Sequence, residues 1–155
     1  MDALTRRRLA VLVALVFGLA ACGTDTGNAA PGHVSVSDGF ALATVTSQPN
    51  GAVYFTVVSP DADTLERVVV PESIADHAEM HDTVTTADGA MTMHEMGSGV
   101  ELEPGTAVTF TPGGKHVMLV DLAKPLAVGE TFDVTLEFAK ADSITLPVAV
   151  VESAP

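Results

Sequence analysis

Hydrophobic and polar side chains alternate without a break over Thr131–Phe138, whose sequence is TFDVTLEF. This period of two predicts a strand with one buried face and one solvated face. Other short runs rich in β-branched and aromatic residues recur from residue 40 onward, and no segment has a convincing helical period over ten or more residues. The remaining predicted strands are Phe40–Thr46, Ala52–Val58, Leu65–Val70, Glu79–Thr86, Ala90–Met96, Thr106–Thr111, His116–Leu122 and Ile144–Val151.

Residues typical of turns separate most of these runs. Proline presets φ, and glycine or asparagine accepts a positive φ, so each group has a physical reason to reverse the chain. Short strands at such regular spacing predict an all-β sandwich or barrel. We assign residues 40–152 to one domain of this class. The turns are expected at residues 48–51, 59–63, 103–105, 112–114 and 128–130.

The N-terminus has the pattern of an export signal. Arg6–Arg8 precede the apolar run Leu9–Ala21, which is too short to span a bilayer as a helix. The run ends in Leu-Ala-Ala-Cys at residues 19–22, which resembles the lipobox of bacterial lipoproteins. This resemblance implies that residues 1–21 are a signal peptide and that Cys22 is lipidated. A plain secretory signal without lipidation and a twin-arginine signal remain alternatives.

Residues 22–39 are mostly small and polar, which predicts a flexible tether in which His33 is solvated. The chain has 7 basic and 20 acidic side chains, and cleavage would remove three arginines and Asp2. The mature chain would then carry 4 basic and 19 acidic side chains, a charge of −15. This charge argues against binding to nucleic acid or to anionic lipid head groups. Attachment to the extracytoplasmic face of the membrane would therefore depend on the lipid at Cys22.

Methionine is unevenly distributed along the chain. Cys22 is the only cysteine, so the predicted domain has no thiol. Methionine used only to fill the core would be scattered, whereas here it gathers with four of the five histidines. Thioether sulfur is a soft, neutral donor and imidazole also binds copper well, so the cluster predicts Cu(I) rather than zinc or calcium. Apart from Met1, the methionines are Met80, Met91, Met93, Met96 and Met118.

Strand periodicity permits these side chains to converge. His116 and Met118 lie two residues apart in one predicted strand and therefore share a face. If residues 87–89 form a three-residue turn that ends in a left-handed glycine, His81 lies diagonal to Met93 on the neighbouring strand. A two-residue turn would instead place His81 and Met93 on opposite faces.

Five short segments form a combined pattern: GAVYFTV at residues 51–57, EMHDT at 79–83, GAMTM at 89–93, PGGKHVML at 112–119 and KPL at 124–126. Together they closely resemble the periplasmic copper chaperones of the PCu(A)C type. The resemblance covers roughly residues 40–150. It implies a cupredoxin-like or immunoglobulin-like Greek-key β-sandwich that binds one Cu(I) ion.

The resemblance further implies that His81, Met93, His116 and Met118 hold the metal. Eleven residues separate His81 from Met93 and twenty-two separate Met93 from His116, one more in each gap than in the family's pattern. Met91 fits that pattern less well and remains the alternative to Met93. Met91 and Met80 are also candidates for auxiliary contacts with the metal.

These features favour a binding protein over an enzyme. The chain has no Gly-x-Ser-x-Gly motif, and the domain has no thiol to act as a nucleophile or as a blue-copper ligand. The resemblance implies a Cu(I) metallochaperone that delivers copper to the Cu(A) site of cytochrome c oxidase or to a related copper protein. A copper-sequestering lipoprotein without a dedicated recipient is the alternative. A scaffold sandwich whose methionines only pack is a third hypothesis.

Overall fold

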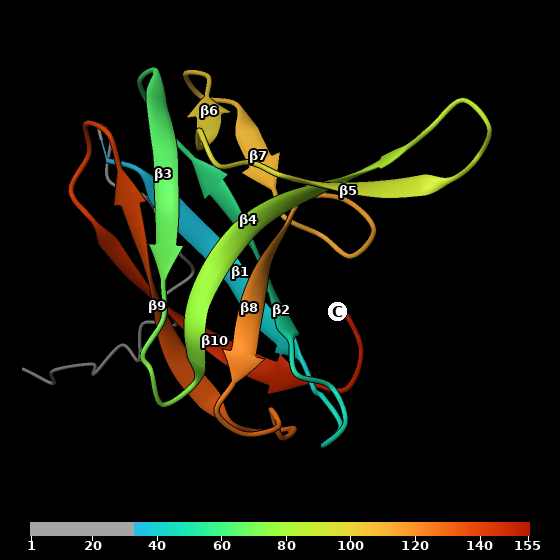
Figure 1. Ribbon diagram of the computed structural model, residues 1–155. Coiled ribbons are helices and arrows are strands. Elements are labelled where there is room, and N and C mark those ends of the chain that lie inside the picture. Colours follow the sequence, from blue (N-terminus) through green and yellow to red (C-terminus); the bar gives the residue numbers. More distant parts are fainter. Residues whose placement is uncertain (1–32) are drawn as a thin grey trace, which may run out of the picture.

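The alternation at the C-terminal end of the chain builds a strand as the sequence predicts, since every second side chain from Phe132 to Phe138 is buried. A computed structural model describes residues 33–155, which form ten strands and no helix (Figure 1). The strands are β1 (Ser35–Leu42), β2 (Gly51–Val58), β3 (Asp63–Val69), β4 (Ala75–Thr85), β5 (Met91–Glu95), β6 (Val100–Leu102), β7 (Ala107–Thr109), β8 (His116–Leu122), β9 (Thr131–Phe138) and β10 (Ile144–Val151).

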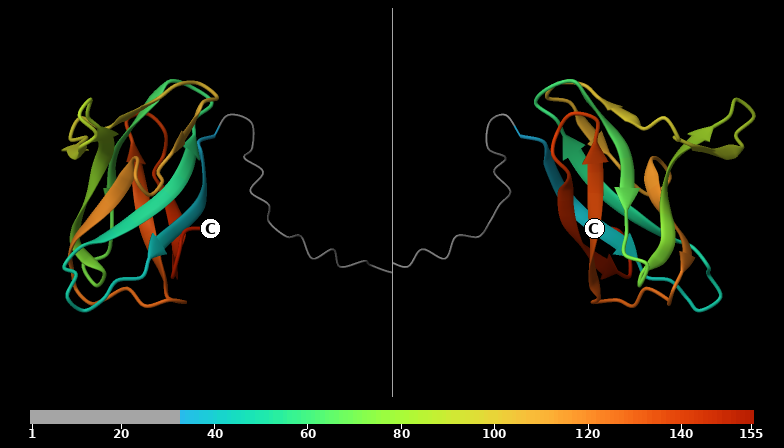
Figure 2. Two further views of the ribbon diagram at one scale, coloured as in Figure 1. Left: turned by 90° about the vertical axis from the view of Figure 1, so that its right-hand side faces the viewer. Right: turned by 60° about the vertical axis from the view of Figure 1, so that its left-hand side comes forward.

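The strands form one continuous sheet in the order β5-β4-β8-β2-β1-β10-β9-β3-β6, and β7 pairs with β2. Neighbours run antiparallel except β1 and β10, which are parallel. The sheet folds on itself, so that β4 and β8 lie across from β1 and β10, and Figure 2 shows the two layers from the side. The predicted all-β sandwich is confirmed.

One hydrophobic core fills the space between the layers. Val117 and Leu119 of β8 belong to the same buried cluster as Val134 of β9 and Val148 of β10. Aromatic side chains strengthen the cluster, because Phe55 and Phe110 stack with ring centroids 4.4 Å apart. The core face of each strand is thereby fixed, and the opposite face of β4 and β8 is left for other side chains.

The first strand begins earlier than predicted. It begins at Ser35, inside the range 22–39 assigned to the tether. Val36 pairs with Val57 of β2, and a register shift between Ser37 and Phe40 accommodates Asp38, whose φ is +57°. This bulge interrupts the alternation of side chains, and therefore the sequence pattern concealed the first part of the strand.

Two further differences concern strand length. The three-residue strand β6 was not predicted, because it is too short to show a period. In contrast, β4 is eleven residues long and begins at Ala75, four residues before the predicted start. His77 therefore lies in the same strand as His81, one of the candidate metal ligands.

The predicted signal peptide, the lipidation site at Cys22 and most of the predicted tether lie outside the described residues, so they remain predictions. Within residues 33–155, no helix has the length and apolar character needed to cross a membrane. His33, at the start of the described part, is exposed as expected.

A buried carboxylate fastens the start of β3. Asp63 is 8% exposed and accepts hydrogen bonds from the backbone N–H groups of Thr64, Lys140 and Ala141 at 2.7–3.0 Å. Burial raises the pKa of Asp63, but the hydrogen bonds from Thr64, Ala141 and Lys140 outweigh it and hold the pKa below its usual value. Asp63 therefore connects β3 to the loop that follows β9.

We expect Asp63→Asn to lower the free energy of unfolding at pH 7 by about 2 kcal/mol, because hydrogen bonds to a charged group contribute roughly 1.5–3 kcal/mol. The folded-state pKa is depressed, so the contribution is fully present above the unfolded pKa and is lost as the pH falls through the folded pKa. The difference from wild type should shrink below about pH 4. Urea denaturation at pH 7 and pH 3 measures it. Asp61→Asn, at an exposed neighbouring position, is the control, and a difference independent of pH would contradict the prediction.

Candidate metal centre

The hairpin of β4 and β5 has the turn that the sequence favours. Thr86 N–H donates to the carbonyl of Ala90 at 2.7 Å, and Gly89 has a φ of +84°. This is the three-residue loop that ends in a left-handed glycine. In the resulting register Met93 pairs with Thr83. Thr83 and His81 lie two residues apart in β4, so Met93 and His81 lie on the same face of the hairpin. The three-residue turn that the sequence argument required for His81 and Met93 to share a face is therefore present.

The next strand brings the second pair of candidate ligands to the same face. In the antiparallel pairing of β4 with β8, His81 lies opposite His116 and Glu79 lies opposite Met118. The two imidazole rings lie with their centroids 5.7 Å apart and are tilted by 33°. Directly opposed residues in a sheet share a face, so His81, His116 and Met118 lie together on the side of the sheet away from the core.

An open hollow of about 430 Å³ lies over this face. Three of the four predicted ligands, Met93, His116 and Met118, line it, and His81 packs beside His116. The histidines are 9% and 8% exposed, whereas Met93 is 51% exposed on the hairpin, which projects from the body of the domain (Figures 1 and 2). The remaining lining residues are Leu42, Ala43, Thr44, Gln48, Asn50, Gly51, Ala52, Tyr54, Thr83 and Gly113.

The hydrogen bonds of the histidines identify their free nitrogen atoms. His116 Nδ1 lies 3.0 Å from the carbonyl oxygen of Gly114, which can only accept, so Nδ1 carries the proton and Nε2 keeps the lone pair. His81 Nε2 lies 2.9 Å from Oε2 of Glu79 and donates to that carboxylate. This leaves His81 Nδ1 buried and without a hydrogen-bond partner among the residues that the structure describes. A buried, unpaired imidazole lone pair is costly in a metal-free protein and is what a soft cation requires.

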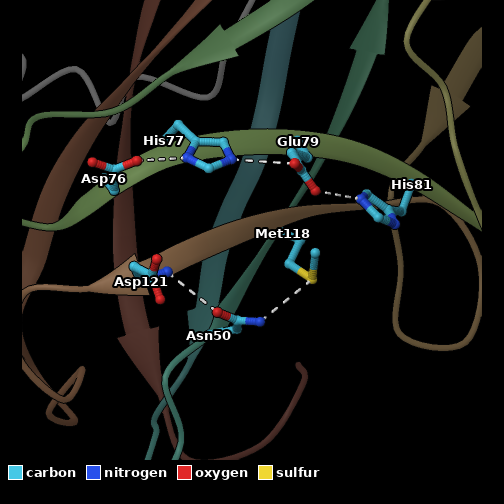
Figure 3. Close-up of polar contacts among 7 residues, drawn as sticks. All are labelled: Asn50, Asp76, His77, Glu79, His81, Met118 and Asp121. Carbon is cyan, nitrogen blue, oxygen red and sulfur yellow. Dashed lines mark hydrogen bonds and ion pairs between the residues drawn. The ribbon is translucent and has the colours of Figure 1, made fainter.

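Glu79 is held from both sides along β4 (Figure 3). Its second oxygen, Oε1, lies 3.1 Å from Nε2 of His77, whose Nδ1 lies 2.8 Å from Oδ2 of Asp76. The hydrogen bonds from His81 and His77 lower the pKa of Glu79. The contacts with Asp76 and Glu79 raise the pKa of His77. Glu79 is therefore ionised at neutral pH beside one of the candidate ligands.

The thioether of Met118 also has a polar neighbour. Asn50 Nδ2 lies 4.0 Å from the sulfur of Met118, and Asn50 Oδ1 accepts from the backbone N–H of Asp121 at 3.2 Å (Figure 3). Asn50 therefore connects the turn before β2 to the end of β8 across the hollow. Neither Asn50 nor Glu79 was predicted from the sequence as a residue of the site. Glu79 could have been found, because it stands two residues before His81 and therefore shares its face.

The structure does not bring Met80 to the other candidate ligands. Met80 neighbours His81 in β4, so its side chain lies on the opposite face, where it is 6% exposed and part of the core. We therefore do not retain Met80 as an auxiliary ligand. Met91 lies on the same face of the hairpin as Met93, pairs with Thr85 and is 65% exposed. His94 is exposed on the other face of β5.

The donor set restricts the metals that could bind. Among residues 33–155, no three side chains of His, Cys, Asp or Glu are grouped closely enough to hold a metal ion. A zinc or calcium site would need such a group. Two imidazoles with two thioethers are neutral and soft, and the unpaired Nδ1 of His81 adds a ready donor. The residues present therefore fit Cu(I).

Comparison with known proteins gives a consistent result. The family described as "Putative lipoprotein LpqE-like" matches residues 34–150. "Putative lipoprotein Lxx21020" of Leifsonia xyli subsp. xyli (strain CTCB07) is 32% identical over 147 residues, which cover 92% of this chain and 87% of that protein.

Two solved structures extend this result to the fold. The copper-bound PCuAC domain from PmoF2 is 28% identical with a TM-score of 0.62, over 82% of this chain and 97% of that one. The apo PCuAC domain from PmoF1 is 26% identical with a TM-score of 0.63, over 82% and 98%. The fold and the family resemblance predicted from the sequence are both confirmed.

Proposed function

The chain belongs to the LpqE-like family and has the fold of PCuAC domains, and on this premise we propose that it is a Cu(I)-binding metallochaperone. The observation that carries the proposal is that Met93, His116 and Met118 line one hollow and His81 packs beside His116, with a buried imidazole nitrogen of His81 left unpaired among residues 33–155. Copper bound by a solved structure of the same fold supports it. The protein is a binding protein and not an enzyme.

In this proposal, copper is cargo. Thioethers and neutral imidazoles lose no proton on binding Cu(I), so binding does not require the deprotonation that a thiolate site would. Met93 is half exposed and the hollow is open, so a recipient can reach the ion without unfolding the domain. These features suit capture and release by exchange of ligands.

The recipient that we propose is the Cu(A) site of cytochrome c oxidase, or a related copper protein outside the cytoplasm. We further propose that residues 1–21 are removed, that lipid on Cys22 anchors the protein to the extracytoplasmic face of the membrane, and that the segment before β1 is the tether. The match to a lipoprotein family supports the anchor. Incorporation of labelled lipid, abolished by Cys22→Ser, tests it.

Titration of the purified protein with Cu(I) under reducing conditions, in competition with a chromophoric chelator, tests the central proposal. We expect one ion per chain with a dissociation constant well below micromolar. Binding no tighter than micromolar would leave the methionines with a packing role only. Incubation of the loaded protein with an apo Cu(A) domain then tests delivery, and tight binding without transfer would indicate sequestration.

A further inference from the structure

Glu79 is the hydrogen-bond acceptor that β4 places beside His81. Its Oε2 accepts from His81 Nε2 at 2.9 Å, and the contact is partly shielded, with the side chains 30% and 11% exposed. Its Oε1 is held by His77 at 3.1 Å, so the carboxylate cannot turn away without breaking a second contact. Glu79 also lies directly opposite Met118 on β8.

A neutral imidazole has one protonated and one free nitrogen, and an acceptor at one nitrogen selects the tautomer. With Glu79 at Nε2, the proton of His81 stays on that atom and Nδ1 presents its lone pair. At His116 the carbonyl of Gly114 selects the opposite tautomer, which frees Nε2. The two facing rings are therefore prepared to offer different nitrogen atoms.

We infer that Glu79 is a positioning residue of the metal centre: it fixes the tautomer of His81, so that Cu(I) is taken by Nδ1 of His81 together with Nε2 of His116. The inference rests on the proposed function. Glu79 also supplies one negative charge beside a cation whose four proposed ligands are neutral, in a setting where water screens charges less than on an open surface.

Two substitutions at this position separate the two effects. Glu79→Gln keeps an oxygen acceptor for His81 Nε2–H and removes the charge. Glu79→Leu removes both the acceptor and the charge while keeping a similar volume. Glu101→Leu, on the exposed face of β6 at the other end of the sheet, is the matched control.

The first measurement uses the metal-free protein and long-range proton–nitrogen correlation spectra of the imidazole rings. We expect the Nε2-protonated tautomer of His81 in wild type, in Glu79→Gln and in Glu101→Leu, and a mixture of tautomers in Glu79→Leu. A predominantly Nδ1-protonated His81 in wild type, or an unchanged tautomer in Glu79→Leu, would overturn the inference. This readout does not depend on whether copper binds, so it distinguishes failure of the inference from failure of the proposed function.

The second measurement adds Cu(I). We expect the nitrogen resonances to move at Nδ1 of His81 and at Nε2 of His116, and Cu(I) affinity to fall about 10- to 100-fold in Glu79→Leu, the usual range for a lost outer contact of a metal ligand. Glu79→Gln should fall less and Glu101→Leu should match wild type. Coordination through Nε2 of His81, or equal affinities for wild type and Glu79→Leu, would also overturn the inference.

Discussion

A double variant, Met93→Leu with Met118→Leu, is expected to fold like wild type and to lose more than about 100-fold in Cu(I) affinity. Loss of a residue that merely orients a ligand costs about 10- to 100-fold, so removal of two donors should cost more. Leucine replaces the volume of each methionine, and such swaps usually cost less than about 1.5 kcal/mol. Both side chains lie on the face of the sheet away from the core. Chelator competition and urea denaturation measure the two quantities.

Two other methionines provide matched controls for this variant. Met80→Leu changes a core methionine next to His81 and should leave Cu(I) affinity unchanged. Met91→Leu tests the alternative ligand on the same face of the hairpin. If Met91→Leu and not Met93→Leu lowered the affinity, the assignment of Met93 would be wrong. If the double variant bound Cu(I) like wild type, the thioether site itself would be refuted.

The second large effect is expected in the core. Phe55 is fully buried in β2 and stacks on Phe110, so Phe55→Ala should lower the free energy of unfolding by about 4 kcal/mol. Phe55 points to the core, whereas its neighbour Tyr54 lines the hollow on the other face of β2. The folded fraction of Phe55→Ala should therefore bind Cu(I) with the affinity of wild type.

Guanidinium denaturation of the metal-free protein measures this loss. Val128→Ala, at a position 61% exposed, serves as the control and should change stability little. A loss in the free energy of unfolding below about 1.5 kcal/mol in Phe55→Ala would mean that neighbouring core side chains fill the cavity left by the phenyl ring. A parallel loss of copper affinity would mean that the core and the metal centre are coupled through β2.

The sequence predicted the fold where its alternation was regular. Thr131–Phe138 has the predicted bounds, because it has one core face and an uninterrupted period of two. The apolar run His116–Leu122 also has the predicted bounds, although hydrophobic and polar residues do not alternate along it. The start of β1 was missed because the bulge at Asp38 breaks that period. The short strand β6 exists through its pairing with β3, and a sequence does not display such distant pairing.

The cluster of methionine and histidine and the resemblance to copper chaperones indicated the candidate ligands from the sequence. The alternation of side chains along the strands and the turn at Gly89 place them on one face. The same alternation excludes Met80 as a metal ligand, because Met80 is adjacent to His81 in the strand and its side chain faces the core. The contact between Asn50 and Met118 joins residues 68 positions apart, and it depends on how β2 pairs with β8. No local pattern carries that information.

The candidate donors also differ in how firmly they are held. Strand β8 lies between β4 and β2, whereas β5 is the last strand of the described sheet and within residues 33–155 has only β4 as a neighbour. An edge strand with exposed side chains opens locally at a lower free energy than an interior strand. For an ion bound as we propose, dissociation would then begin at Met93, while His116 and Met118 stayed in place. The rate of Cu(I) release would then depend on how often the β4–β5 hairpin opens. The ligands on the interior strand β8 would hold the ion between these openings.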